Sequence, residues 1–339
     1  MSTTSPPPDS EPRKRARTSH DEDECVDAHE DKEFWFDDGT IVLLAGQVKF
    51  RVYRGVLTEH SPVFVEMLSL PQPSEAPASQ YSCPVIRLHD NPETLRHVFR
   101  LLMPRKIAMI TSSFVYSAPT FDMVSAYIRI AHKYQMDALL HQWLEYLQKH
   151  FTHRFADWVS HKRMVPEGFA PIHAIGVVNL ARLTGVSSIL PTALAVCTTL
   201  GSNIVEGFTR GDDDCLEQLS TDDLGRCFQA KGLLIQANAN AVALALAPRT
   251  AGDECSTRAV CLEQMRIFCE CQRSSYDTSY LYPEGPVPSW KRYSRRLSDY
   301  NICRHCLEMM EGEYLDTQGT RTWMRLPEIT GVQVDGWGL

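Results

Sequence analysis

Apolar and polar residues follow two different periods between residues 34 and 150. Ile41 to Ala45 is a continuous apolar run, and Gly46-Gln47 then supplies a turn. Over residues 48–52 apolar positions alternate with Lys49 and Arg51. This pattern predicts a hairpin in which a buried strand is followed by a half-exposed one.

Two helix starts follow the hairpin, and both carry the same signature. Ser61-Pro62 and Asn91-Pro92 each combine a side-chain oxygen that can cap free amides with a proline suited to the first turn. Val85 to Leu88 lies between them and is typical of a third short strand. Two more apolar-faced helices follow before residue 150. The order predicts an α+β fold, with a short three-stranded sheet capped by helices.

The chain beyond residue 150 has the spacing of helices. The stretches 173–186 and 187–201 carry apolar faces, and Ser220 has an acid three residues later, which resembles a capping box. We therefore expect a mainly α-helical C-terminal region. Residues 151–250 are either a helical extension of the first domain or an independent small helical domain, and residues 251–339 form a cysteine-containing region.

Residues 1–33 have the composition of a disordered, charged tail. A basic cluster is followed by an acidic run, and such charge blocks cannot bury apolar surface. The basic residues of the cluster are Arg13, Lys14, Arg15 and Arg17. Their density suits a nuclear import signal and predicts a nuclear location. The alternative is a merely solvated tail on a cytoplasmic protein.

Composition narrows the classes of function. The 339 residues are 43% hydrophobic and 22% charged, with a formal net charge of −8. This balance disfavours nucleic-acid binding, which relies on clustered positive charge. We expect neither a secretory signal, because the N-terminal MSTTSPPPDSEP lacks an apolar core, nor a membrane span. Eleven cysteines without such a signal indicate a reducing compartment.

Four C-terminal cysteines are candidate metal ligands. Cys303 and Cys306 have the two-residue gap that lets both thiolates reach one tetrahedral zinc. Cys269 and Cys271 form a tighter pair with a one-residue gap. Together they predict a structural zinc site. The alternative is that these are reduced cysteines on helix faces, which behave as small buried hydrophobes.

The sequence disfavours an enzyme. It contains no G-x-S-x-G elbow, no phosphate-binding Walker loop, no G-x-G-x-x-G and no H-E-x-x-H. His60 next to Ser61 does not make a catalytic dyad, because adjacent helical residues do not face each other.

Four stretches in this order resemble a BTB/POZ domain over residues 34–150. They are FRVYRGVL, SPVF, VIRLHDNPETLRHVFRLL and AHKYQMDAL. The chain is similar, more narrowly, to BTB proteins abundant in mushroom-forming fungi, whose C-termini often carry a W-x-x-L-P element; Trp323, Leu326 and Pro327 match it. The resemblance implies a protein-interaction fold, commonly a homodimer, without catalytic activity. Members act as substrate adaptors of cullin ubiquitin ligases or in transcriptional regulators.

The resemblance also points to an interaction surface. Dimeric BTB regulators often pair a basic residue after the second strand with an aspartate near the first strand. Arg54 is the basic residue here, Asp37 and Asp38 are the nearest acids, and Tyr53 stands where the family usually has histidine. We expect these four residues to take part in self-association or partner docking. The function predicted is non-enzymatic protein interaction in nuclear regulation, with a cullin adaptor as the alternative.

Overall fold

The protein was examined as a computed structural model that describes nine stretches of the chain. These are residues 28–70, 81, 83–103, 118–161, 163–212, 214–245, 250–274, 297–314 and 319–338. The chain divides into two compact units, one from residues 28–55 and 81–92 and the other from residues 56–70 and 93–338. Strands dominate the first unit and helices the second, so the predicted α+β class is confirmed.

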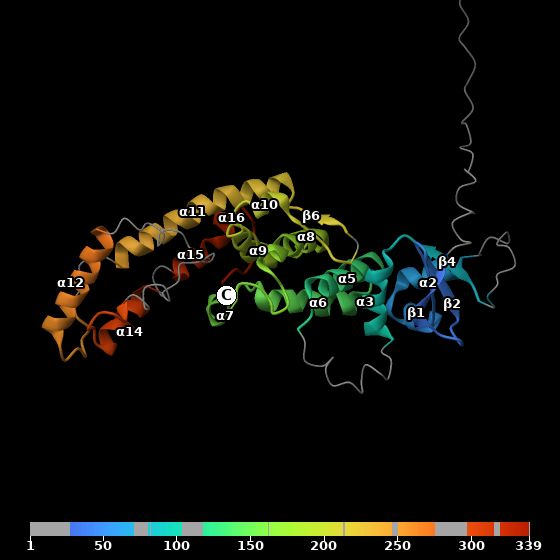
Figure 1. The fold of residues 1–339 in the computed structure, drawn as a ribbon, viewed down its shortest axis with the longest axis horizontal. Helices are drawn as coiled ribbons and strands as arrows, with labels where there is room; N and C mark the ends of the chain where they lie inside the picture. Colours follow the sequence, from blue (N-terminus) through green and yellow to red (C-terminus); the bar gives the residue numbers. More distant parts are fainter. Residues whose placement is uncertain are drawn as a thin grey trace, which may run out of the picture. The chain divides into compact units, whose positions relative to one another are not determined.

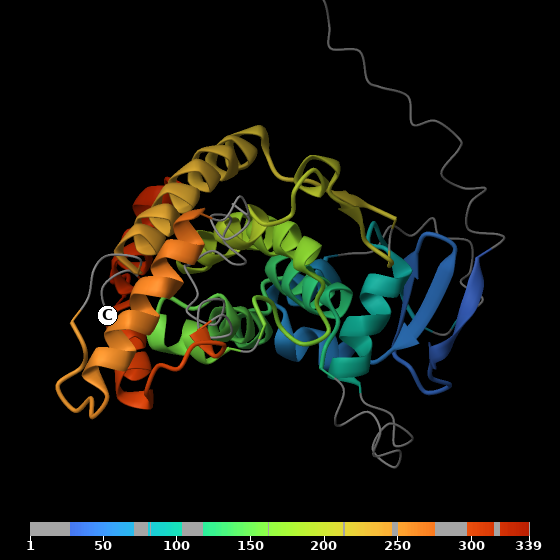
Figure 2. The ribbon, with the colours of Figure 1, turned by 60° about the vertical axis from the view of Figure 1, so that its left-hand side comes forward.

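A small mixed sheet forms the first unit, and it is seen at the blue end of the chain in Figure 2. Its strand order is β1-β3-β2-β4. The predicted hairpin is present: β2 and β3 pair antiparallel, and Gly46 turns between them with a positive φ of 53°. The outer strands β4 and β1 pair parallel with β2 and β3. The strands are β1 (His29–Trp35), β2 (Ile41–Ala45), β3 (Val48–Val52) and β4 (Val85–Leu88).

Strand β1 is one more strand than the sequence predicted. It begins at His29, so residues 29–33, which we had expected in the charged tail, belong to the sheet. Asp31 is 4% exposed and accepts hydrogen bonds from the backbone amides of Glu33 and Phe34, at 2.9 and 2.7 Å. These bonds compensate for the buried carboxylate, so an acidic stretch forms a strand. The charged composition of strand β1 resembles that of the preceding tail, so the sequence alone did not predict this strand.

Helices α1 and α2 follow β3, and the predicted cap at Ser61 is confirmed. The Ser61 hydroxyl accepts a hydrogen bond from the Phe64 amide at 3.1 Å. The same hydroxyl donates to the Tyr134 carbonyl at 2.6 Å, and the Phe64 and Tyr134 rings stack at 4.6 Å. One side chain therefore starts a helix and fastens it to a residue 73 positions away. The helices are α1 (Arg54–His60), α2 (Pro62–Ser69), α3 (Pro92–Leu102), α5 (Phe121–Lys133) and α6 (Asp137–His150).

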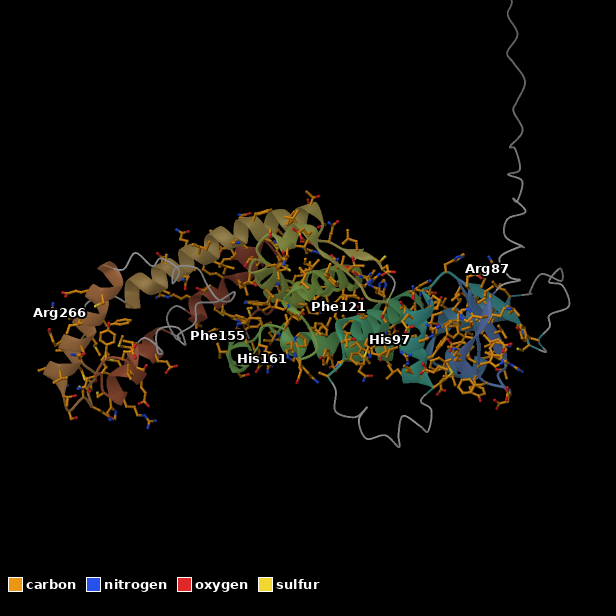
Figure 3. The ribbon with its side chains drawn as sticks, viewed as in Figure 1. Arg87, His97, Phe121, Phe155, His161 and Arg266 are labelled. Carbon is orange, nitrogen blue, oxygen red and sulfur yellow. The ribbon has the colours of Figure 1, made fainter. Side chains whose placement is uncertain are left out.

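Further helices surround an apolar core centred on α8 and α9, and the predicted helical character beyond residue 150 is confirmed. Phe121, labelled in Figure 3, lies within this core and contacts the rings of His173 and Phe208. Gly176 is required there because a Cβ atom would overlap the Phe121 ring. The elements are α7 (Phe155–Ser160), η3 (Pro171–His173), α8 (Ala174–Thr184), η4 (Ser187–Ile189), α9 (Leu190–Cys197), α10 (Asn203–Glu206), β5 (Phe208–Thr209) and β6 (Leu216–Glu217).

The C-terminal segment completes that same core. Helix α11 (Thr221–Ala245) starts at the predicted cap, where the Ser220 hydroxyl accepts from the Asp223 amide at 3.1 Å. It contacts α9 and α16 (Leu326–Thr330), as Figure 1 shows. Trp323, in α15 (Thr320–Met324), is fully buried and donates its indole N–H to the His153 carbonyl at 3.0 Å. Trp323 and Leu326 of the W-x-x-L-P element are therefore core residues.

None of the helices in the described parts of the chain combines the length and the apolar character that crossing a membrane requires.

Candidate functional site

The predicted interaction residues lie just after the first and third strands of the sheet. Asp37 and Asp38 are exposed in the turn after β1, and Arg54 is exposed at the start of α1. The Tyr53 hydroxyl donates to the Asp38 carboxylate at 2.7 Å, and its ring packs at 4.9 Å against Phe36. The structure thus joins Asp38 to Tyr53. Asp38 and Tyr53 thus form an exposed polar corner of the first unit, next to the Phe36 ring.

Arg54 is held at this corner through its backbone. Its amide donates to the Thr40 hydroxyl at 2.8 Å, which fixes the change from β3 to α1. The guanidinium projects from an exposed position at the first residue of the helix. Exposed charged side chains such as Arg54, Asp37 and Asp38 suit electrostatic matching with a partner, which governs specificity and association rate more than raw affinity.

A second candidate site lies in the C-terminal region, between helices α12 (Arg258–Ser274) and α14 (Arg304–Tyr314), which lie side by side in Figure 1. Four cysteine sulfurs gather there, all within 4.8 Å of one another. They belong to Cys255, Cys261, Cys303 and Cys306. Around a zinc ion with Zn–S bonds of about 2.3 Å, tetrahedral sulfurs lie about 3.8 Å apart. The Cys255 and Cys303 sulfurs are 3.6 Å apart, so this group of thiols could bind a metal ion.

Backbone amides point at two of these sulfurs. The Cys303 amide donates to the sulfur of Cys261 at 3.3 Å, and the Gly252 amide donates to that of Cys306 at 3.4 Å. The Thr257 hydroxyl lies 3.3 Å from the Cys261 sulfur. Such donors stabilise a thiolate, which is the form that binds metals.

The thiols differ in how easily each loses its proton. Burial raises the pKa of Cys261, but hydrogen bonds from Thr257 and the Cys303 amide outweigh it and lower that pKa to about 7. Burial raises the pKa of Cys306 to about 12, and neighbouring cysteines add to the rise although the Gly252 amide opposes it. Crowded thiols cannot all ionise together without a cation, because each new negative charge repels those already present.

Both helices direct their N-termini at the sulfur cluster. Cys303 immediately precedes α14 and Cys306 is its third residue, whereas Cys261 is the fourth residue of α12. Cys255 lies in the turn before α12, with its amide bonded to the Gly252 carbonyl at 3.0 Å. The partial positive charge of a helix N-terminus favours anions, including the net charge of −2 that four thiolates around a divalent ion would carry.

The structure brings together only part of the cysteine set that the sequence suggested. Cys303 and Cys306 are in the cluster, with Cys255 and Cys261 in place of Cys269 and Cys271. Cys269 lies eight residues after Cys261 in α12, which is roughly 12 Å along a helix axis. Cys269 and Cys271 are therefore outside the cluster despite their one-residue gap. The cluster cysteines share another feature, because each pair has one member before its helix and one in the first turn of that helix.

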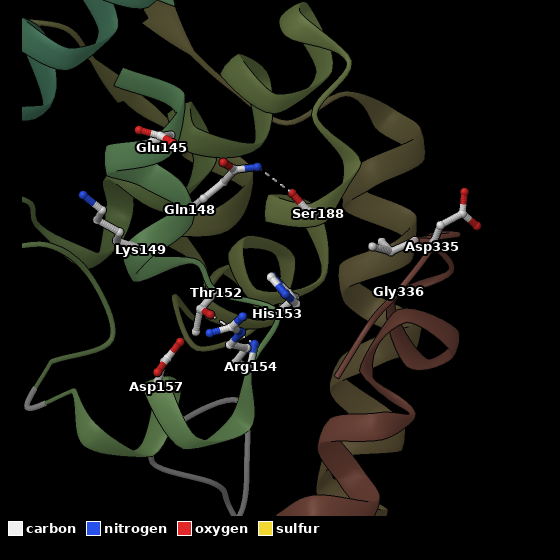
Figure 4. Close-up of a pocket in the computed structure, with 11 residues that line it drawn as sticks. Glu145, Gln148, Lys149, Thr152, His153, Arg154, Asp157, Ser188, Asp335 and Gly336 are labelled. Atoms are coloured by element: carbon white, nitrogen blue, oxygen red, sulfur yellow. Dashed lines mark hydrogen bonds between the residues drawn. The ribbon is translucent and has the colours of Figure 1, made fainter. Parts of the chain in front are cut away.

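A pocket in the helical unit is a further place where a ligand could bind. Figure 4 shows a pocket of about 430 Å³ beside α6, where Gln148 donates to the Ser188 hydroxyl at 3.0 Å. Its lining mixes acids such as Asp157 with bases such as Lys149 and Arg154, and this mixture favours no single class of ligand. The basic residues Arg13, Lys14, Arg15 and Arg17 lie outside the described residues.

Two histidines are stacked in the helical unit. The rings of His150 and His161, the latter labelled in Figure 3, lie 4.9 Å apart. Burial, with a smaller contribution from His161, lowers the pKa of His150. Burial also lowers the pKa of His173, whose Nδ1 accepts a hydrogen bond from the Ala170 amide at 3.1 Å. The lowered pKa values of His150 and His173 favour their neutral forms in the folded protein.

Comparison with protein-family models matches residues 29–151 to the BTB/POZ domain. This part of the chain is therefore a BTB/POZ domain, and it begins at the same residue as β1. A comparison with curated proteins found no match.

Proposed function

We propose that this protein is a non-enzymatic interaction protein whose BTB/POZ domain docks protein partners, a second copy of the chain among them. The BTB/POZ match over residues 29–151 carries this proposal. The exposed corner of Tyr53, Arg54, Asp37 and Asp38 supports it, because charged groups on a rigid turn can fix the register of a partner.

Light scattering on the full chain tests self-association. The expected mass at micromolar concentration is twice the 38.4 kDa of one chain. Arg54→Ala should shift the equilibrium toward the monomer and leave the melting temperature unchanged. Arg325→Ala is the control, because this arginine is also exposed, at 62%, and lies between α15 and α16 in the second unit. A monomer mass at every concentration would reject self-association and leave docking of other proteins.

We propose that the protein acts in nuclear regulation. The alternative is that it is a substrate adaptor of a cullin ubiquitin ligase. The cluster of Arg13, Lys14, Arg15 and Arg17 supports the nuclear role through its charge density. Alanine at all four positions should move a fluorescently tagged chain from the nucleus to the cytoplasm. Affinity purification from the native host with mass spectrometry then separates the two roles. Co-purification with a cullin would favour the adaptor.

We propose in addition that the metal ion bound by the cysteine cluster is zinc. Four cysteine sulfurs within 4.8 Å of one another suit a metal ion that prefers thiolate ligands, and a site with four protein ligands is typical of structural rather than catalytic zinc. The amide donors to Cys261 and Cys306 would offset part of the negative charge of the loaded site. The alternative is four reduced thiols that only fill space.

Metal analysis of the purified full chain tests this. We expect one zinc per chain, and Co²⁺ exchanged into the site should show the strong visible absorption of a tetrahedral thiolate complex. Cys306→Ser should lose the metal. Cys271→Ser is the matched control, since this exposed cysteine lies on α12 outside the cluster. A metal-free protein from zinc-supplemented cells would support the space-filling alternative.

A further inference from the structure

The segment around the cysteine cluster has a core of its own, and that core is small. Among the described residues, nine side chains are buried in it, and three of these are cluster cysteines. They are Ala241, Cys255, Cys261, Met265, Phe268, Leu297, Ile302, Cys306 and Met310. The core centred on α8 and α9 holds thirty buried side chains. The sulfur atoms are thus a large share of what this segment buries.

Among the described residues, α12 and α14 are held by this small core, by the contact of α14 with α11 and by exposed ion pairs. Helix α12 has 17 residues and α14 has 11, and most helical stability in proteins comes from packing against other elements rather than from the helix itself. On the outer face of α12, Arg266 (Figure 3) bonds Glu263 and Glu270 at 2.7 and 2.6 Å, but these side chains are more than half exposed. Exposed pairs of this kind contribute little to stability. Segments with so small a core are usually stabilised by disulfides or metals.

The four cysteines come from different parts of the segment, so one bound ion would connect these parts to each other. Cys255 comes from the turn before α12, Cys261 from the first turn of α12, and Cys303 and Cys306 from the start of α14. The two sulfur-directed amide bonds cross the same junctions, from Cys303 to Cys261 and from Gly252 to Cys306. Without a cation, these contacts would depend on four crowded thiols.

We infer that metal binding and folding are one event in residues 250–274 and 297–314, so that α12 and α14 are folded only when the cysteine cluster is loaded. This inference rests on the proposed zinc and adds its consequence for the chain. The segment exists in two states set by metal supply, whereas the core of α8 and α9 is independent of the metal. Any partner surface on α12 or α14 is then present in the loaded protein alone.

Hydrogen exchange with mass spectrometry tests this on the full chain, before and after removal of zinc with a strong chelator. In the loaded protein we expect slow exchange in α12 and α14. After chelation their exchange should rise by roughly 100-fold or more, as for local unfolding, while peptides from α8 and α9 change by less than about 3-fold. Adding zinc back should restore protection. Cys306→Ser should behave as the chelated protein and Cys271→Ser as the loaded one.

The outcomes separate the two proposals. If the chain holds no zinc and takes none up, both the proposed zinc and this inference are wrong. If zinc is bound and its removal is verified, but α12 and α14 stay protected, zinc binding stands and coupled folding is wrong. Loss of protection throughout α8 and α9 would also overturn the inference, because the metal would then support the whole unit.

Discussion

Ser61→Ala should weaken helix α2 and its attachment to Tyr134 at the same time. The Ser61 hydroxyl accepts from the Phe64 amide and donates to the Tyr134 carbonyl, and Ser61 is 1% exposed. Loss of an N-cap costs about 1 kcal/mol, and loss of one internal hydrogen bond costs about 1 kcal/mol more. The two losses add because the hydroxyl uses its acceptor and its donor separately. Together they should lower the local free energy of opening by roughly 2 kcal/mol.

Hydrogen exchange of the full chain measures this change directly. A loss of roughly 2 kcal/mol corresponds to amide exchange about 30-fold faster in the peptide that covers α2. Ser69→Ala is the control, because its hydroxyl donates to the Glu66 carbonyl on the exposed end of the same helix. It should change exchange by about twofold or less. Equal exchange in Ser61→Ala and the parent, or equal acceleration in the two variants, would refute the reasoning.

Three further changes probe the core and its pH dependence. Leu57→Asp places a charge at a position 1% exposed and should cost roughly 3 kcal/mol or more; a melting temperature within a degree of the parent would place Leu57 outside the core. Trp323→Ala should cost about 4 kcal/mol and speed exchange in α9, and unchanged α9 protection would contradict its place in that core. The pKa of His173 is lowered in the fold, so the unfolded chain binds its proton more readily; stability should be full above about pH 6.5 and decline as the pH falls below it. His173→Gln should flatten that decline in melting temperature, and an unchanged slope would assign it to other groups.

Local signals predicted much of the sheet and the helix starts. The apolar run from Ile41, the turn at Gly46 and the cap at Ser61 each depend on a few neighbouring residues, so the sequence alone was sufficient. Strand β1 could not be recognised in the same way. Its Asp31 is compensated by two backbone amides whose positions exist only after folding.

The cysteine cluster shows the same limit at longer range. The spacing of Cys303 and Cys306 is a local property of the sequence, and both residues belong to the cluster. Their partners are 42 or more residues earlier in the chain and depend on how α12 packs against α14. All of these cysteines are visible in the sequence. Cys261 joins the cluster and Cys269 does not, because they lie at different positions along the same helix.

The position of Trp323 in the core has a consequence for synthesis of the chain. Helix α9 ends at Cys197, and Trp323 follows 126 residues later (323 − 197). At the usual pace of translation a ribosome needs roughly 10 seconds to cover that distance. During this interval the nascent helices expose the apolar surface that Trp323 and Leu326 will cover. We therefore expect chaperones to bind these helices of the nascent chain until Trp323 has been synthesised. A nascent chain on a ribosome stalled before residue 319 should be prone to aggregation.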